Sequence, residues 1–149
     1  MKLVNVKPPQ VAGLLLAVSV ALHFALPQEY RLDFACRACG AVVFASGFSV
    51  MLWAGWLFRQ SGTPVRPTDR ASALVTTGPF RFSRNPMYLG VAVMLLAVAW
   101  WVGTWPMLLA PIGFVGFMSR VRIPYEEQQL REIFGEAYAS YTERVRRWI

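Results

Sequence analysis

Two short polar stretches, each at the edge of a long apolar run, contain the residues of this sequence best suited to chemistry. The first, "RFSRNPMYLG" (81–90), combines two arginines, an Asn-Pro step and the hydroxyl of Tyr88. The second, "RVRIPYEE" (120–127), places Glu126 and Glu127 shortly after two further arginines. If the two stretches meet, they form a pocket with cations, carboxylates and aromatic faces.

Such a pocket suits a ligand that carries an ammonium group, a carboxylate and a flat aromatic base. Carboxylates hold the ammonium, arginine or backbone N–H groups hold the carboxylate, and apolar side chains sandwich the base. S-adenosylmethionine has all three parts, although a nucleotide or a lipid headgroup also fits. Helix capping and charge pairing at a membrane interface explain each residue separately, so a non-enzymatic helical-bundle membrane protein remains an alternative.

Histidine and cysteine are too few for most metal or redox chemistry. His23 is the single histidine, which excludes a bis-histidine haem or a histidine-rich zinc site within one chain, and no metal is predicted. We interpret it as a neutral, hydrogen-bonded side chain in the bundle. Cys36 and Cys39 form a Cys-x-x-Cys pair, but a quinone-linked thiol oxidoreductase needs a second pair, and the chain has none. The pair is therefore interpreted as incidental or as a passive disulfide.

Four apolar runs must position these groups. Charged residues make up 15% of the chain, against about 25% in ordinary soluble domains. Each run approaches the roughly 20 residues that a spanning helix needs. We predict an all-α, polytopic membrane helical bundle with about four transmembrane helices, forming one integral membrane domain over residues 1–149. The runs are 11–26, 40–58, 87–103 and 105–119.

Details within the runs refine this prediction. The first run is long for a signal-peptide core and is followed by a poor cleavage site, so it is interpreted as a retained helix. Gly103 and Thr104 leave little room between the last two runs, which predicts a tight antiparallel hairpin. Pro111 is expected to kink the last span, where neighbouring groups can satisfy the freed carbonyl.

The basic residues predict the orientation. A net charge of +7 could suggest nucleic acid, but the arginines flank the apolar runs, as in membrane proteins, so no nucleic-acid partner is predicted. All of the 15 lysines and arginines except Arg31 and Arg37 lie in the N-terminus, the 59–86 segment or the C-terminal tail. We expect a multi-pass protein of the bacterial inner membrane with both termini in the cytoplasm.

The C-terminal tail has the pattern of an amphipathic helix. Pro124 fits a first helical turn, and Glu126 and Glu127 then lie where the helix dipole favours negative charge. Basic residues beside an aromatic stripe predict a helix that lies on the cytoplasmic membrane surface. The predicted apolar face consists of Leu130, Ile133, Phe134, Ala137, Tyr138, Tyr141, Val145 and Trp148.

Taken together, "LVTTGPFRFSRNPMYLG" and "EEQQLREIFGEAYASY" resemble the isoprenylcysteine carboxyl methyltransferase and phospholipid methyltransferase family of small membrane enzymes. The resemblance covers about residues 72–147, and the chain is similar to bacterial members of the family. It departs at Asn85, where the family usually has histidine, and at Phe80, where it often has tyrosine. Asparagine keeps a donor and an acceptor but cannot carry a proton. The matching positions are Leu74, Val75, Thr76, Gly78, Arg84, Pro86, Tyr88, Gly90, Glu126, Glu127, Phe134, Gly135, Tyr138 and Tyr141.

The resemblance implies that S-adenosylmethionine binds between the cytoplasmic ends of the last two spans and the C-terminal helix. It implies that Glu126 receives the cofactor's ammonium, that Glu127 supports Glu126, and that Arg122 faces the methyl acceptor. Ser72 and Ala73 align with cofactor-contacting positions without matching them by type. The remaining residues implied around the cofactor are Leu74, Val75, Phe80, Asn85, Pro86, Met87, Tyr88 and Gly90.

The implied activity is transfer of a methyl group to a lipophilic acceptor that enters from the bilayer. A carboxylate acceptor, like that of an isoprenylcysteine, needs no general base, and Arg122 can hold it. Amine acceptors need to lose a proton, and the sequence offers no obvious base beyond Glu127 or a tyrosine, which weighs against them. Phospholipid amine N-methylation and thiol S-methylation remain alternatives.

Overall fold

The structure, a computed structural model, describes residues 4, 6–26, 36–61 and 73–149. Arg31 and Ser72, which entered the predictions above, lie outside these residues. The described part is a bundle of α-helices, which confirms the predicted all-α membrane architecture. Its α-helices are α1 (Pro8–Ala25), α2 (Arg37–Gln60), α3 (Pro86–Val102), α4 (Leu109–Phe117) and α5 (Ile123–Arg144). Shorter elements are two 3-10 helices, η3 (Gly78–Arg81) and η4 (Trp105–Leu108), and a π-helical segment, η5 (Met118–Arg122).

The helices match the predicted apolar runs. By length and composition, α1, α2 and the continuous helical stretch Trp105–Arg144 can each cross a membrane. Helix α3 is a shorter apolar helix of 17 residues. Proline lies in the first turn of α1 and of α3, where a missing N–H costs no hydrogen bond. Length and composition therefore make this an integral membrane protein.

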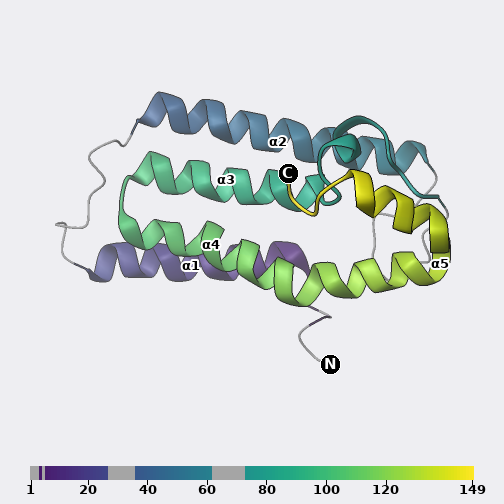
Figure 1. The fold of residues 1–149 in the computed structure, drawn as a ribbon. Helices are drawn as coiled ribbons and strands as arrows, with labels where there is room; N and C mark the ends of the chain where they lie inside the picture. Colours follow the sequence, from purple (N-terminus) through teal and green to yellow (C-terminus); the bar gives the residue numbers. More distant parts are fainter. Residues whose placement is uncertain (1–3, 5, 27–35, 62–72) are drawn as a thin grey trace.

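Helices α1 to α4 run in alternating directions along the bundle, and α5 first continues in the direction of α4 (Figure 1). Helix α3 packs most extensively against α2, and α1 packs against α4. The start of α1, the end of α2, the start of α3 and the whole of α5 therefore lie at one end of the bundle, on the right in Figure 1. This arrangement brings together the described parts of the three basic segments; that this end faces the cytoplasm remains a prediction.

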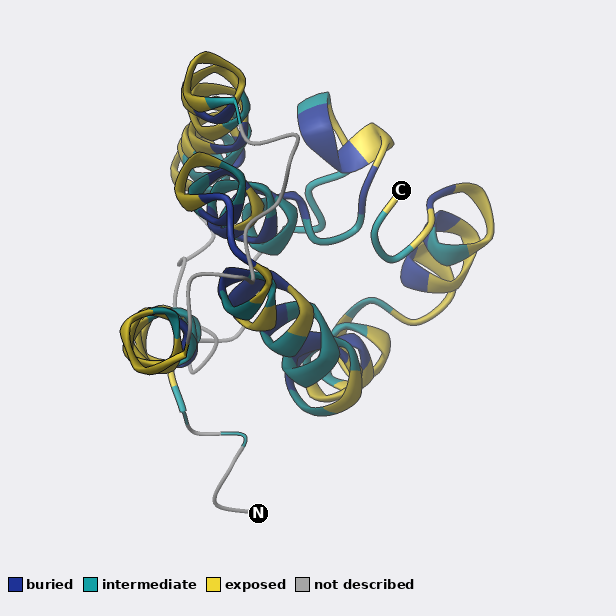
Figure 2. Ribbon diagram, turned by 90° about the vertical axis from the view of Figure 1, so that its left-hand side faces the viewer, coloured by how far each residue is buried: buried dark blue, intermediate teal, exposed yellow. Residues whose placement is uncertain are grey.

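The outward faces of α1 and α2 consist largely of exposed residues (Figure 2), many of them large and apolar. Leu14 and Phe24 of α1 and Val42 of α2 are 66%, 80% and 69% exposed, respectively. Water-soluble monomers rarely expose continuous apolar surface of this kind, whereas lipid tails solvate it well. The outward faces of α1 and α2 thus fit a lipid environment, and the polar contacts are concentrated elsewhere.

Helices α2 and α3 meet through glycines. A Cβ atom placed on Gly90 would come within 2.6 Å of the Gly47 carbonyl oxygen, and one on Gly47 within 2.8 Å of the Gly90 carbonyl oxygen. Small residues allow backbones to approach this closely, which is a common way to pack helices in membranes. The close backbone approach expected at Gly90 is thus made to α2, and the assignment of Gly90 to the cofactor remains a prediction.

The hairpin between α3 and η4 is tight, as predicted, because Gly103 ends α3 in the left-handed conformation. The expected kink at Pro111 is not what interrupts the last helix. Pro111 lies in the first turn of α4, just after the 3-10 turn, and the irregular hydrogen bonding comes later, at the π-helical segment η5. A π-helical segment adds a residue to a turn, so it rotates the face presented by everything that follows, including Glu126.

The predicted single apolar stripe of the tail does not form on one straight helix. Gly135 has a φ of 50° and a ψ of −122°, which breaks α5 and turns its last part back toward η3 (Figure 1). Glycine adopts this conformation without the steric cost that a Cβ would bring. Beyond the turn, Tyr138, Tyr141 and Val145 are buried against protein, whereas Ile133 before it stays exposed.

Candidate functional site

A hydrogen-bonded group of three side chains joins the start of α3 to η5 and α5. The hydroxyl of Tyr88 donates to Glu126 Oε1 over 2.7 Å, and Arg122 Nε donates to the same oxygen over 2.8 Å. Arg122 and Glu126 are four residues apart, which places them on neighbouring turns. We call Tyr88, Arg122 and Glu126 the Glu126 cluster.

Both bonds to Glu126 use one carboxylate oxygen. Among the described residues, no group bonds the second oxygen, Oε2, and the Glu126 side chain is 20% exposed. The Arg122 guanidinium is more buried and also donates through Nη1 to the backbone carbonyl of Val4. The cluster therefore combines a carboxylate fixed through one oxygen with an open acceptor at the other, beside a positive charge.

A second ion-pair group surrounds the adjacent carboxylate, and we call Arg84, Glu127 and Arg147 the Glu127 cluster. Arg147 donates two hydrogen bonds to Glu127, from Nε to Oε1 over 3.1 Å and from Nη2 to Oε2 over 2.7 Å. Arg84 Nη1 lies 3.1 Å from Oε1. The hydrogen bonds to Glu127 raise the pKa of Arg147 above its ordinary value, so Arg147 remains charged.

Asn85, the departure from the family pattern, makes a structural contact. Its side-chain Nδ2 donates to the backbone carbonyl of Arg147 over 3.0 Å, and its own N–H donates to the Ser83 hydroxyl. The Arg84 N–H in turn donates to the Arg146 carbonyl over 3.0 Å. The start of α3 is thereby tied to the residues that follow α5.

Aromatic residues build the wall between the 73–80 segment and the folded-back part of α5. Tyr141 donates its hydroxyl to the Phe80 carbonyl over 2.7 Å, and Phe80 packs edge-on against Phe58 of α2. Leu74 packs against the buried group that contains Tyr138 and Tyr141. Tyr138 also lies beside the charges of the Glu127 cluster, so this aromatic wall adjoins that cluster.

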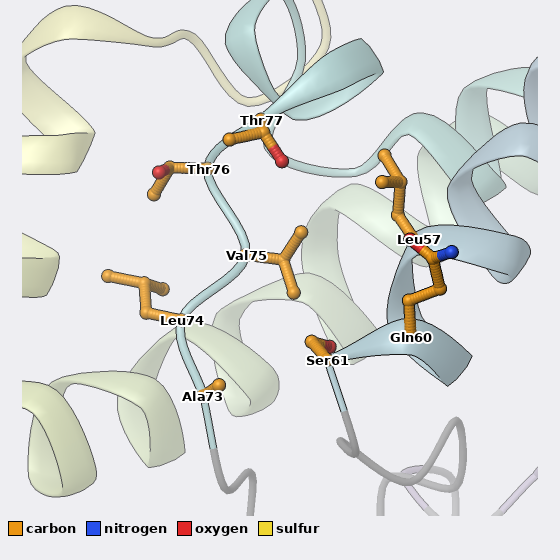
Figure 3. A pocket seen from close by; sticks show the side chains of 8 residues that line it. All are labelled: Leu57, Gln60, Ser61, Ala73, Leu74, Val75, Thr76 and Thr77. Carbon is orange, nitrogen blue, oxygen red and sulfur yellow. The ribbon is translucent and has the colours of Figure 1, made fainter.

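The 73–77 segment lines a pocket of about 320 Å³ at the end of α2 (Figure 3). Leu74 and Val75 point to opposite sides of the segment, with Val75 directed toward α2. The volume is at the lower end of the range for small-molecule sites. Its lining residues are Leu57, Gln60, Ser61, Ala73, Leu74, Val75, Thr76 and Thr77.

The structure therefore divides the predicted site residues among several places. Tyr88, Arg122 and Glu126 make direct contacts in one cluster. Leu74 and Val75 line the pocket by α2, while Pro86 is buried and Met87 half-buried in the first turn of α3. The others take part in neighbouring contacts, Glu127 in its own cluster, Asn85 at the Arg147 carbonyl and Phe80 in the aromatic wall.

Two participants were missed by the sequence reasoning. Arg147 was counted only as positive charge of the tail, and nothing in its immediate sequence distinguishes it from Arg144 or Arg146. Arg84 was noted, but not as the partner of Glu127. The Nε atom of Arg84 is buried and has no hydrogen-bond partner among the described residues. An unused donor of this kind suits a ligand that brings an acceptor.

The opposite end of the bundle holds simpler polar contacts. His23 Nδ1 lies 3.1 Å from the Thr104 hydroxyl, as expected for a hydrogen-bonded histidine in the bundle. Cys36 and Cys39 are free cysteines, and Cys36 Sγ accepts a hydrogen bond from the Cys39 N–H at the start of α2. The structure thus shows an N-cap contact at the Cys-x-x-Cys pair in place of a disulfide.

Comparison with known proteins places the chain in a family of methyltransferases. The family model described as phospholipid methyltransferase matches residues 35–137, more than half of the chain. Protein-S-isoprenylcysteine O-methyltransferase B of Arabidopsis thaliana is 40% identical over 78 residues, covering 48% of this chain and 36% of that protein. No solved structure matches the chain.

Two further relatives show how the match is distributed. The protein-S-isoprenylcysteine O-methyltransferase of Saccharomyces cerevisiae is 37% identical over 79 residues, covering 48% of this chain and 30% of the yeast protein. An uncharacterized protein of Haemophilus influenzae is 36% identical over 63 residues, which are 42% of this chain and the whole of that protein. The chain spans about a third of the length of the plant methyltransferases that it matches.

Proposed function

Because the chain belongs to the phospholipid methyltransferase family, we propose that it is a membrane methyltransferase that uses S-adenosylmethionine and methylates a lipophilic acceptor. The observation that carries the proposal is the Glu126 cluster. Tyr88 and Arg122 hold one oxygen of Glu126 and leave the other open, so the carboxylate is positioned to accept a hydrogen bond from an ammonium group.

The described residues fit the other parts of this cofactor. The unused Arg84 Nε offers a donor for a carboxylate. Leu74 and Val75 supply apolar surface for a base, and Leu74 lies near the Glu127 cluster through Tyr138. We propose that Pro86, Met87 and Asn85 complete the wall between these parts. When bound, S-adenosylmethionine supplies a sulfonium methyl group that a nucleophile can displace.

The residues of the chain would contribute alignment and exclusion of water. Glu126, fixed by two hydrogen bonds, would hold the amino-acid end of the cofactor in one place, which reduces the entropy lost on reaching the transition state. Arg122 would hold the acceptor. Its Nη1 binds the Val4 carbonyl, and an oxygen of an acceptor carboxylate has the same hydrogen-bonding character.

These points favour a carboxylate acceptor on a prenyl or similar apolar chain. The plant and yeast relatives named above are called isoprenylcysteine O-methyltransferases. A carboxylate is already a nucleophile at neutral pH, so no residue has to remove a proton from it. An amine acceptor has to lose a proton to a base. The two carboxylates at this place, Glu126 and Glu127, are both paired with arginines.

The proposal is tested with membranes that contain the full chain and S-adenosylmethionine labelled in its methyl group. We expect label in a base-labile ester of an S-prenylated cysteine, and little in an amine-headgroup phospholipid. Glu126→Ala should remove the labelling, whereas Glu132→Ala, at an exposed carboxylate on the same helix, should not. Label only in the phospholipid would overturn the acceptor, and absence of any labelled lipophile would overturn the activity.

A further inference from the structure

The last five residues of the chain, 145–149, form a segment that we call the C-terminal strap. It follows α5 and lies against the start of α3, where the Arg84 N–H donates to the Arg146 carbonyl and Asn85 Nδ2 donates to the Arg147 carbonyl, each over 3.0 Å. Val145, at its beginning, is buried with Tyr138 and Tyr141. The strap is therefore held to α3 by backbone carbonyls and to α5 by packing.

Two side chains of the strap extend these contacts to α5 and η5. Arg147 makes its two hydrogen bonds to Glu127, and Trp148 Nε1 donates to the Ser119 hydroxyl over 3.0 Å. The Trp148 ring also packs against the buried core between the helices. The strap thus bonds α3, η5 and α5, which are the three elements that supply the Glu126 cluster.

The anchoring points lie next to the cluster residues in the sequence. Each of Tyr88, Arg122 and Glu126 has a neighbour, one to three positions away, that is hydrogen-bonded to the strap. Those neighbours are, in the same order, Asn85, Ser119 and Glu127. Helix α3 otherwise packs mainly against α2 and less against α4, so these bonds fix how α3 sits relative to α5.

We propose that Asn85 and Arg147 are positioning residues of the cofactor site, acting through the C-terminal strap on Tyr88, Arg122 and Glu126. The inference rests on the proposed function. Asn85 uses its amide as a hydrogen-bond donor to a carbonyl, a task that requires no proton transfer. A histidine ring N–H can make the same donation, so the role does not depend on asparagine itself.

The first test compares two substitutions of Asn85 in the purified full chain, with S-adenosylhomocysteine binding measured by calorimetry. Asn85→Asp is nearly isosteric but sets a carboxylate oxygen against the Arg147 carbonyl. We expect it to weaken binding about tenfold, the size of one lost hydrogen bond with an unfavourable contact. Asn85→His restores a donor and should bind more tightly than Asn85→Asp. Equal affinities for the wild type and Asn85→Asp would overturn the role of Asn85.

The second test separates the strap from direct contact with the cofactor. Arg147→Gln removes the positive charge and the two parallel hydrogen bonds to Glu127. Arg147→Lys keeps the charge but has a single ammonium group as donor. We expect binding to weaken in the order wild type, Arg147→Lys, Arg147→Gln. The matched control Arg144→Gln should leave binding unchanged, because Arg144 is exposed and, among the described residues, bonds the Ser140 carbonyl of its own helix.

Hydrogen exchange of the ligand-free protein distinguishes the possible failures. The hydrogen-bonded amides of residues 84, 85 and 89 should exchange faster in Arg147→Gln and Asn85→Asp than in the wild type, and equal rates would overturn the role of the strap whatever the calorimetry shows. Faster exchange in the variants, together with a wild type that does not bind S-adenosylhomocysteine, would instead overturn the proposed function and leave the strap as a stabilising contact only.

Discussion

Two adjacent carboxylates of α5 are placed in very different surroundings. Glu127 is nearly buried, and both of its oxygens are bonded by arginines from distant parts of the chain. Glu126 is more exposed, and its two partners share one oxygen. Successive residues on a helix point about 100° apart, so neighbours in sequence meet different elements. The comparison suggests that Glu127 holds the fold together at this end and that Glu126 is available to a ligand.

The largest expected effect is on stability, from Glu127→Ala. The substitution leaves Arg84 and Arg147 close together with no negative charge between them. We expect a loss of about 3 kcal/mol in the free energy of unfolding, at the low end for a buried pair because Arg147 is partly exposed. Unfolding in mixed detergent measures it. A change as small as that of Glu132→Ala would remove the structural role of the Glu127 cluster.

The next effect is on binding, from Glu126→Ala. Removing the carboxylate should weaken S-adenosylhomocysteine binding about 30-fold, because a hydrogen bond to a charged group contributes about 2 kcal/mol. The free energy of unfolding should fall much less than in Glu127→Ala, since Arg122 retains the Val4 carbonyl as a partner. Calorimetry and detergent unfolding on both variants show the contrast. It disappears if Glu126→Ala destabilises the protein as strongly as Glu127→Ala.

A smaller effect is expected from Tyr88→Phe, which removes only the hydroxyl that orients Glu126 Oε1. Binding of S-adenosylhomocysteine should weaken about fivefold, corresponding to about 1 kcal/mol for one hydrogen bond. The ring and its packing against the core are kept, so unfolding should change little. A loss of binding as large as that of Glu126→Ala would mean that Tyr88 contributes more than orientation.

The smallest effect on binding is expected at the opposite end of the bundle, from Thr104→Val. This substitution removes the hydroxyl beside His23 Nδ1 and should cost about 1 kcal/mol of stability. Binding of S-adenosylhomocysteine should not change, because His23 and Thr104 lie at the other end of the helices. Altered affinity in Thr104→Val would show that the two ends of the bundle are coupled and would weaken the comparison between the carboxylates.

Much of the fold followed from local patterns in the sequence. The first three apolar runs match α1, α2 and α3 to within a few residues, and Gly103 marked the hairpin. The fourth run matches the start of the last helical stretch, which continues to Arg144. The expected kink at Pro111 was wrong in position, because the proline lies in a first turn while the irregularity is π-helical. The single apolar stripe of the tail was also wrong, since Gly135 turns the helix, and periodicity alone does not reveal such a turn.

The candidate site followed from the sequence only in part. Tyr88, Arg122 and Glu126 were singled out from their motifs, and the structure joins them by hydrogen bonds. The salt bridges of Glu127 with Arg84 and Arg147 were not foreseen, because Arg147 resembles its arginine neighbours in sequence. The close contact of Gly90 with Gly47 was not foreseen either, because it depends on how α2 and α3 cross, and no local pattern specifies that crossing.

The sequence by itself determined which segments become helices in a membrane and which end of the bundle collects the basic residues. Those properties depend on apolar length and on the order of charges along the chain, which are local quantities. Only the tertiary structure decided that two neighbouring glutamates take separate roles, and that the last five residues tie α3 to α5. The partners of those contacts are up to 62 residues apart, and their meeting depends on one π-helical segment and one glycine turn that redirect α5.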